Sequence, residues 1–436
     1  LRNENGTIAG YDEDGNKISV SYESVSTEKL LNNNDPEVVV FKDGSRVFAL
    51  NPGTGTEIND STDAATVIQS AVDNATEGGD VFIRKGQYQI GSPITVTTPG
   101  VRVLGEGAPW ATATGNDTPV GTVLDATADL NPMLTLDEQF TDVFFVSFDG
   151  NDTASRLLRN KNKDHKIAYC GLQSATVANM RFTGDNSWLK NNWIEYAGDF
   201  GIEINAGGGD IWIKDNLFVG NTTSDIEACN VPLEYATIQG NKFQTTDMAV
   251  RTSATVRESK ITGNSFEGVG QESGNKSASD RVWSINGDIE HSVFADNTID
   301  GTDPDGVQQT SEVLGVEDST ITVTDFQVHN NPHRNLSGDF LADNGVPGFN
   351  VQEPSFDVHR NLSPSSGTVS VSFDGRYAST PSLDVTLAGN SVVSWIVSSW
   401  DYDGNGNRIG ATLEFANMDG SAANPTVEVV RVSPAQ

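Results

Sequence analysis

Residues 211–218 have the sequence Ile-Trp-Ile-Lys-Asp-Asn-Leu-Phe, and five variants of this octet occur between Trp188 and Gly301. Each variant contains apolar residues, a polar pair, an asparagine, one variable residue and an apolar anchor. The asparagines lie 24, 25, 23 and 33 residues apart, and they are Asn192, Asn216, Asn241, Asn264 and Asn297. Self-similarity at this period predicts a solenoid in which each repeat forms one coil.

The composition of the octet predicts that each coil is built from short β-strands. Its residues are mostly β-branched or aromatic, and no helical periodicity lies between the copies. The one long spacing contains residues 271–280, which we interpret as a loop rich in Gly and Ser. We therefore predict an all-β fold, a parallel β-helix whose coils lie ~4.8 Å apart.

Residues one repeat apart should stack in columns along such a β-helix. In the quoted octet we expect Ile211, Ile213 and Phe218 to face the core, because side chains alternate along a strand. The asparagines should form a ladder of side-chain amides at a turn. Cys170 and Cys229 fall in different columns, Cys170 near the inward anchor position, so we predict two separate thiols.

The net charge and the lack of long apolar stretches limit the kinds of partner that we expect. The 436 residues include 60 acidic and 27 basic side chains, a formal net charge of −33, which disfavours nucleic acid as a partner. Such a surplus resembles proteins of halophiles, so we expect stability to rise between low and molar salt. No apolar stretch approaches the roughly 20 residues of a transmembrane helix, and we expect no membrane insertion.

The N-terminal part divides into two segments. Residues 1–58 are short β-like runs separated by turns, which we interpret as a β-hairpin attachment or adaptor segment. Residues 61–75 place Ile68, Ala71, Val72 and Ala75 on one face, and Gly78 follows shortly after. This pattern predicts a helix that caps the first coil of a β-helix extending over residues 59–334.

The capping region contains Ile-Gln-x-Ala-Val-Asp at 68–73, Gly-Gly-x-Val-x-Ile at 78–83, Gly-x-Tyr at 86–88 and Leu-Gly-Glu-Gly at 104–107. It resembles the start of the pectate-lyase-like right-handed β-helix superfamily, which includes polysaccharide lyases, glycoside hydrolases and viral tailspikes. The resemblance implies a right-handed parallel β-helix with an N-terminal capping helix. The polygalacturonase signatures Asn-Thr-Asp, Asp-Asp and Gly-His-Gly are absent from the sequence, so no catalytic residue can be transferred.

The C-terminal part changes in character. We interpret residues 335–362 as a linker and the alternating strands of 363–436 as a C-terminal β-sandwich. Between two of these strands, Asp401, Asp403 and Asn405 match the first half of a calcium-binding loop, although Thr412 replaces the expected Glu. The segment is either a hairpin turn or a calcium site, and calcium is the one cofactor that the sequence suggests.

One outward column could carry catalysis. Glu203 and Glu227 follow successive asparagines at the same distance, and one further repeat reaches Arg251. The two carboxylates should lie about one coil apart, near the ~5 Å separation of a retaining glycosidase pair. Such proximity would raise the pKa of one of them. The alternative is a surface charge ladder with no catalytic role.

Other residues are candidates for binding. Trp188 and Trp212 should face outward on successive coils, and Trp193 should form a second apolar pair with Leu217. Exposed indole faces suit either sugar rings or a neighbouring subunit. Residues 151–166 are interpreted as a basic loop that either neutralises its neighbours or holds an anionic sugar. Its candidate binding residues are Arg156, Arg159 and Lys161.

Two functional hypotheses follow. In the first, the chain is a trimeric viral or cell-surface spike or fibre, closest in style to tailspikes of viruses with halophilic archaeal hosts. It would bind a host-surface polysaccharide or glycoprotein through the β-helix face and the C-terminal domain, and lie on the virion surface. In the second, it is a secreted polysaccharide lyase or glycoside hydrolase that acts on an acidic polysaccharide. The sequence favours the first and leaves enzymatic activity open.

Overall fold

The computed structural model describes two compact units, Leu1–Val231 and Pro232–Gln436. Within the described residues, we find no helix with the length and apolarity needed to cross a membrane. The described residues are all except 1, 5–6, 12–16, 19–35, 108–120, 207–208, 229–230, 245–246, 270–280, 302–309, 311, 335–339, 353–356, 363–367, 378–381, 388–392, 403–407, 418–426 and 434–436.

The first unit begins with antiparallel strands. β1 (Arg2–Glu4), β2 (Thr7–Tyr11) and β3 (Lys17–Ile18) form a small sheet. β4 (Val38–Asp43), β5 (Arg46–Asn51) and β6 (Thr56–Ser61) form a meander whose first strand pairs in parallel with β7. These three strands, which we predicted to belong to an attachment segment, therefore extend a sheet of the β-helix.

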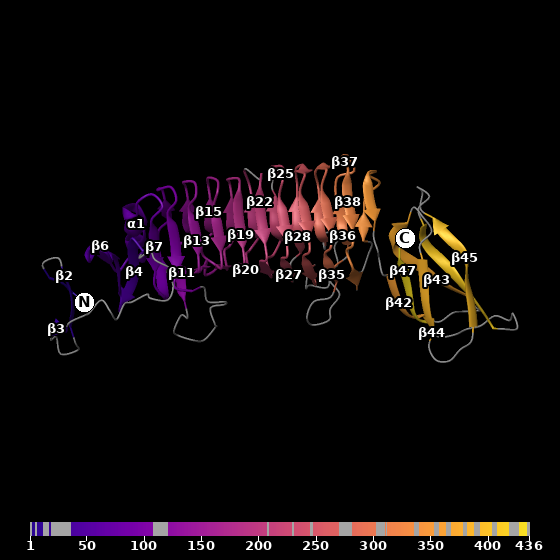
Figure 1. The fold of residues 1–436 in the computed structure, drawn as a ribbon, viewed down its shortest axis with the longest axis horizontal. Helices are drawn as coiled ribbons and strands as arrows, with labels where there is room; N and C mark the ends of the chain where they lie inside the picture. Colours follow the sequence, from indigo (N-terminus) through magenta and orange to yellow (C-terminus); the bar gives the residue numbers. More distant parts are fainter. Residues whose placement is uncertain are drawn as a thin grey trace. The chain divides into compact units, whose positions relative to one another are not determined.

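The predicted capping helix is confirmed as α1 (Ala64–Asn74). The Asp63 side chain accepts a hydrogen bond from the backbone N–H of Ala65 at 3.1 Å, which caps the helix N-terminus. Val67, Ile68 and Val72 are buried, and the helix packs against β4, β5, β6, β8 and β9. The helix thus covers the first coil, as Figure 1 shows beside β4 and β7.

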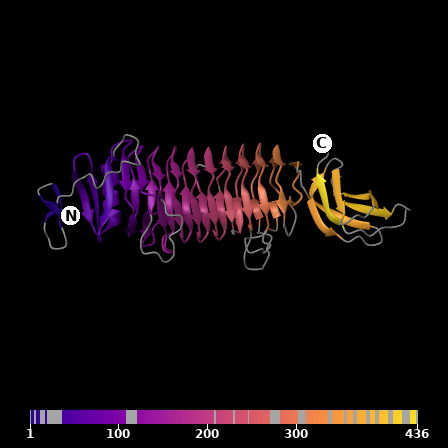
Figure 2. The same cartoon turned by 60° about the horizontal axis from the view of Figure 1, so that its bottom comes forward.

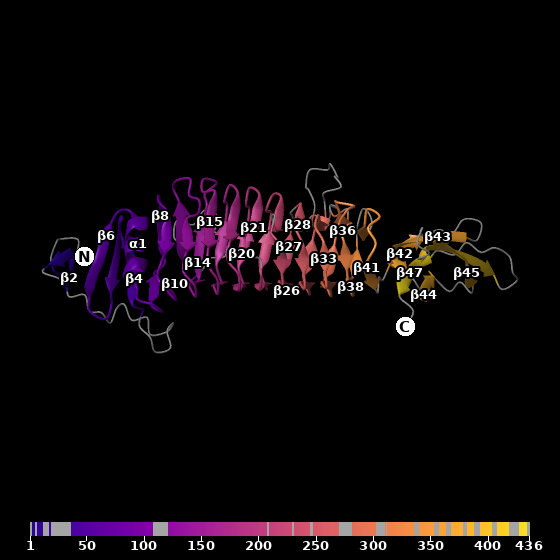
Figure 3. The same cartoon turned by 90° about the horizontal axis from the view of Figure 1, so that it is seen from above.

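Three parallel sheets make up the rest of the first unit (Figures 1 and 2). Sheet I contains β7 (Asp80–Ile83), β10 (Arg102–Gly105), β13 (Asp142–Phe144), β16 (Lys166–Ala168), β19 (Ser187–Lys190) and β22 (Ile211–Lys214). Sheet II contains β8 (Gly86–Ile90), β11 (Thr122–Ala126), β14 (Val146–Asp149), β17 (Gly171–Gln173), β20 (Trp193–Glu195) and β23 (Leu217–Val219). Sheet III contains β9 (Ile94–Val96), β12 (Leu134–Leu136), β15 (Arg156–Asn160), β18 (Ala178–Phe182), β21 (Phe200–Ile204) and β24 (Ser224–Ala228). Figure 3 shows β15 and β21 beside β14 and β20 of the neighbouring sheet.

The second unit repeats this arrangement and adds a fourth sheet. One sheet contains β26 (Thr237–Gln239), β30 (Lys260–Thr262), β34 (Val293–Ala295), β38 (Phe326–His329) and β41 (Phe349–Gln352). The next contains β27 (Lys242–Gln244), β31 (Ser265–Glu267), β35 (Thr298–Asp300) and β39 (His333–Arg334). The third contains β28 (Met248–Thr252), β32 (Arg281–Ile285), β36 (Glu312–Val316) and β40 (Leu341–Ala342). The added sheet contains β25 (Leu233–Glu234), β29 (Val256–Arg257), β33 (Ile289–Glu290) and β37 (Val323–Thr324).

Two three-stranded antiparallel sheets follow the last coil. The first consists of β42 (Asp357–Leu362), β47 (Val427–Ser433) and β44 (Ser382–Leu387). The second consists of β43 (Thr368–Tyr377), β46 (Arg408–Asn417) and β45 (Val393–Tyr402). β40, β41 and β42 all fall within residues 335–362, where we expected a linker, so strands occupy much of that segment.

The predicted columns are confirmed by the register. Ile211 and Ile213 are buried, and Phe218 is the Cα partner of Ile194, which is also buried. In the second unit, the rings of Phe243 and Phe266 stack with centroids 4.9 Å apart. The apolar stack inside the coils is therefore the core of the β-helix.

The asparagine ladder is also confirmed. The Asn192 side chain donates to Asn216 Oδ1 at 2.9 Å, and the same oxygen accepts the backbone N–H of Asn192. Asn264 and Asn297 repeat both bonds in the second unit. The ladder extends to Asn331, whose Oδ1 accepts both bonds from Asn297. The asparagines therefore satisfy buried backbone groups at a turn, which is a structural role.

Cys170 occupies a different column from the one we predicted. Its backbone N–H donates to Asn192 Oδ1 at 2.9 Å, so it takes a place in the asparagine ladder instead of the inward anchor position. Its thiol is free, and burial raises its pKa to about 12. Cys229 lies outside the described residues.

Candidate functional site

A column of four charged residues crosses sheet III. Arg159 on β15 is the Cα partner of Arg181 on β18, Arg181 is the partner of Glu203 on β21, and Glu203 is the partner of Glu227 on β24. The predicted register of the two glutamates is therefore confirmed. Arg181 joins the column at a position that the sequence analysis missed, because the octet that set our register begins only at Trp188.

The two glutamates are buried, although we expected them on an exposed column. Glu203 is 5% exposed and Glu227 is 2% exposed. Arg156 Nε donates to Glu203 Oε2 at 2.8 Å, and Asn205 donates to Glu203 Oε1 at 2.8 Å. Glu227 accepts from the Ser224 hydroxyl at 3.0 Å. Both carboxylates are thus engaged by protein groups instead of facing open solvent.

The pKa of Glu203 is lowered, so Glu203 is not the member of the pair whose pKa proximity would raise. Burial acts to raise it, but the hydrogen bonds from Arg156 and Asn205 and the charges of Arg156 and Arg181 outweigh burial and lower it. A general acid needs a raised pKa, so Glu203 is poorly suited to that role. Arg251, the third predicted catalytic residue, lies on β28 in the second unit, with Ser284 as its Cα partner.

We predicted that residues 151–166 form a loop, but a strand occupies the middle of this segment. Residues 156–160 form β15, in which Leu157 and Leu158 are buried. Arg156 and Arg159 therefore lie on a strand. Lys161, which follows β15, pairs with Asp137 at 2.6 Å, and this ion pair satisfies the neutralising role that we considered for the segment.

A second candidate site is the outer face of sheet I, where tryptophan and lysine side chains lie next to one another on neighbouring strands. Trp188 and Trp212 are Cα partners, and their ring centroids lie 5.4 Å apart at an angle of 50°. Trp188 is 47% exposed. Lys166 is the Cα partner of Trp188. Lys190 and Lys214, each two residues after a tryptophan and so on the same face, are also Cα partners. We call these five residues the tryptophan–lysine face.

Two further aromatic residues lie at the turn that follows sheet I, and the sequence analysis missed them. The rings of Phe145 and Tyr169 stack with centroids 5.1 Å apart and an interplanar angle of 11°. Both residues have positive φ, which is uncommon for aromatic residues, and both are more than two-fifths exposed. They follow β13 and β16, upstream of the octets that set our columns. They extend the exposed aromatic surface beside the tryptophan–lysine face.

Trp193 does not belong to that face. It lies on β20 in sheet II, where Leu217 is its Cα partner, as predicted. Its indole N–H donates to Glu195 Oε2 at 2.7 Å. The sequence-predicted binding residues are therefore divided among three sheets: Trp188 and Trp212 on sheet I, Trp193 on sheet II, and the arginines on sheet III.

The predicted calcium loop is only partly described. Asp401 is exposed at the end of β45, whereas Asp403 and Asn405 lie outside the described residues. Among the residues that the structure describes, no group of three or more His, Cys, Asp or Glu side chains could hold a metal ion. Calcium binding at this loop stays a prediction.

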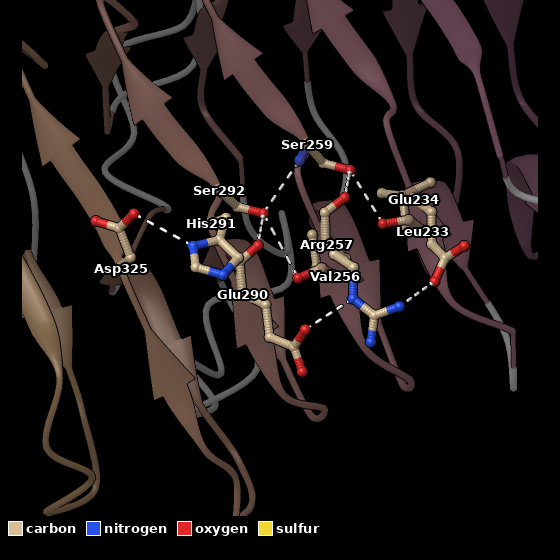
Figure 4. Close-up of polar contacts among 9 residues, drawn as sticks. All are labelled: Leu233, Glu234, Val256, Arg257, Ser259, Glu290, His291, Ser292 and Asp325. Carbon is tan, nitrogen blue, oxygen red and sulfur yellow. Dashed lines mark hydrogen bonds and ion pairs between the residues drawn. The ribbon is translucent and has the colours of Figure 1, made fainter.

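The second unit has its own surface charge ladder (Figure 4). Arg257 pairs with Glu234 at 2.8 Å and with Glu290 at 2.7 Å, while exposed His291 lies 3.2 Å from Asp325. Ion pairs in solvent contribute little free energy, and carboxylates outnumber the single guanidinium, so the ladder has no excess positive charge to attract an anion. This ladder is therefore best explained as a support for the short strands of the added sheet.

Asp225, on β24 of sheet III, is a fully buried carboxyl. Asn221 donates to its Oδ1 at 2.7 Å, but its Oδ2 has no hydrogen-bond partner among the described residues. Burial raises the pKa of Asp225 well above its ordinary value, and the bond from Asn221 only partly opposes this shift. Burial thus favours the protonated form of Asp225.

The raised pKa gives a testable pH dependence. A carboxyl whose folded pKa is raised contributes stability that is present below its unfolded pKa and lost as pH rises toward the folded pKa. We expect Asp225→Asn to be more stable than the parent at pH 8 and to converge with it near pH ~4, the ordinary range of aspartate. Urea unfolding across this pH range measures the difference. Exposed Asp185→Asn is the control, and a difference for Asp225→Asn that does not change with pH would contradict the assignment.

Comparison with known proteins found distant likenesses among solved structures. No protein-family model matches the sequence, and no curated protein matches it. Among solved structures, the chain is similar to ORF18 of Geobacillus virus E2, at 14% identity and a TM-score of 0.33 over 85% of this chain and 75% of that one. It is also similar to the tailspike gp49 of Acinetobacter baumannii bacteriophage Fri1, a capsular polysaccharide depolymerase, at 11% identity and a TM-score of 0.37 over 85% and 82%. A third is an alginate lyase from Paenibacillus sp. str. FPU-7, at 14% identity and a TM-score of 0.32 over 66% and 96%. Likenesses at this level do not extend to activity, and the chain's own sheets define it as an all-β, parallel β-helix protein.

Proposed function

We propose that this chain is a spike or fibre protein that binds a host-surface polysaccharide or glycoprotein through the tryptophan–lysine face. The observation that carries the proposal is the register pairing of Trp188 with Trp212 on one exposed sheet face. Indole faces stack on the apolar faces of sugar rings, and two of them one coil apart suit successive units of a chain. The C-terminal sheets would provide a second contact with the host surface.

The same proposal includes the location, the oligomeric state and the host of the protein. The chain would act outside the cell or on a virion surface, as a trimer, in a virus of halophilic archaea. The net charge of −33 supports the salt-rich setting, since such a surplus needs screening. Light scattering at molar salt should then give three times the mass of one chain.

The second candidate function is a secreted polysaccharide lyase or glycoside hydrolase. It is favoured by one observation, the register pairing of Glu203 with Glu227. Against it, Glu203 is bound by Arg156 and has a lowered pKa, and both carboxylates are buried. Glu203 is therefore a poor proton donor, and neither carboxylate is exposed enough to act as an accessible nucleophile. We therefore favour binding without chain cleavage.

The tryptophan substitutions test this proposal. On an array of neutral and acidic surface polysaccharides at molar KCl, we expect Trp188→Ala and Trp212→Ala each to weaken binding by about 1 kcal/mol, roughly fivefold in Kd. Trp193→Ala is the matched control, because it removes an indole from sheet II and should bind like the parent. Equal losses in all three variants would contradict the assignment of the face.

The glutamate substitutions separate the two functions in the same assay. Glu203→Gln and Glu227→Gln should leave polysaccharide binding unchanged, and the parent should release neither reducing ends nor unsaturated products. Turnover by the parent that is abolished in both variants would replace binding with catalysis as the function of the chain.

A further inference from the structure

Two arginines contact one carboxylate on sheet III, and a third lies beside one of them. Arg156 Nε lies 2.8 Å from Glu203 Oε2, Arg181 Nε lies 3.6 Å from the same oxygen, and Arg159 occupies the position beside Arg181. Because the pKa of Glu203 is lowered, its carboxylate is ionised at neutral pH. Counting Glu227, the next residue of the column, the three arginines outnumber the two glutamates by one, in a chain with 60 acidic and only 27 basic residues.

The pairing of Arg159 with Arg181 is electrostatically unfavourable by itself. Their Cα atoms are partners on neighbouring strands, which lie ~4.8 Å apart, and like charges directly opposite each other destabilise a sheet. In the part of the chain that the structure describes, Arg159 has one side-chain bond, from Nε to Thr183 Oγ1 at 3.3 Å. Arg181 Nε has no hydrogen-bond partner there. The terminal nitrogens of both guanidinium groups are thus available as donors.

Glu203 orients two of the arginine side chains before any ligand binds. Its side chain is 7% exposed, and it contacts Arg156 and Arg181, whose side chains are 14% and 26% exposed. Half-buried guanidinium groups that are already oriented lose little entropy when they bind an anion, and they act in a medium that screens charge less than water does. These are the physical requirements of an anion-binding site.

We propose that Arg159 and Arg181 form a binding site for a tetrahedral oxyanion, a sulfate or phosphate group. A carboxylate has two oxygens and is satisfied by one guanidinium fork, whereas two adjacent forks need three or more acceptor oxygens. A tetrahedral oxyanion provides them. The group could be a free ion or an ester on a glycan.

This site goes beyond the proposed function and does not depend on it. It lies on sheet III, whereas the tryptophan–lysine face lies on sheet I. A sulfate or phosphate ester on the same polysaccharide could engage both, but binding of the inorganic ion needs only the arginines. The two proposals can therefore fail separately.

Isothermal titration calorimetry of the full chain with sodium sulfate tests the site. Chloride keeps the ionic strength equal in all arms. We expect one sulfate per chain, and about a tenfold loss of affinity in Arg159→Gln and in Arg181→Gln. Lys190→Gln makes the same charge change on sheet I and should bind sulfate like the parent, as should Trp188→Ala. Arg159→Gln loses only the bond to Thr183, so its fold should be retained, which a circular dichroism melt checks.

The choice of anion tests the chemistry. Glucuronate should bind at least about tenfold more weakly than sulfate, because one fork satisfies a carboxylate. Inorganic phosphate and glucose 6-phosphate distinguish a free ion from an ester: tighter binding of either one supports the site and identifies its source. Glucuronate binding as tightly as sulfate would overturn the tetrahedral assignment. Equal losses in Lys190→Gln and Arg159→Gln, or no saturable binding in the parent, would overturn the site itself.

Discussion

Asn264→Ala is expected to lower the free energy of unfolding by about 4 kcal/mol, because it breaks the asparagine ladder at an interior step. Asn264 Oδ1 accepts both the backbone N–H and the side chain of Asn241, and its Nδ2 donates to the backbone carbonyl of Ile238 and to Asn297 Oδ1. Alanine would leave several of these groups buried without partners. Each such group costs about 1–3 kcal/mol, so the losses add to several times the cost of one exposed bond.

Urea unfolding followed by circular dichroism measures the loss. Asn74→Ala is the matched control, since it removes an exposed amide at the end of α1 whose side chain donates only to the Ser70 carbonyl. The control should change the free energy of unfolding by less than about 0.5 kcal/mol. A loss below about 1 kcal/mol for Asn264→Ala would mean that water replaces the amide bonds, and that the ladder does not hold the coils together.

The sequence was sufficient to predict the coils, because their period is set by backbone geometry. Asn192 to Asn297 occupy equivalent positions, and each satisfies the same turn of the coil before it. A ladder position can also be filled without an asparagine, provided that its backbone N–H donates to the next coil. Cys170 does this, and for that reason the pattern did not reveal it.

The site was less predictable, because burial of an outward column depends on contacts that no periodicity encodes. The spacing placed Glu203 and Glu227 in one column, but their engagement by Arg156 and Ser224 comes from residues outside the octets. Charged residues at both ends of β15 made a strand look like a loop. The buried pair Leu157 and Leu158 was the one signal that could have corrected this interpretation.

Phe218→Ala and Leu217→Ala test the assignment of the two faces with neighbouring residues on one strand. Phe218 is fully buried in the core column with Ile194, whereas Leu217 is half-buried on the outer face beside Trp193. We expect Phe218→Ala to cost about 3–4 kcal/mol in the free energy of unfolding, because it removes transfer energy and leaves a cavity. Leu217→Ala should cost less than about 1 kcal/mol, since solvent or neighbouring side chains can fill the space. Urea unfolding of both variants measures the costs, and a larger loss at Leu217 would show that the inward and outward faces of β23 are reversed.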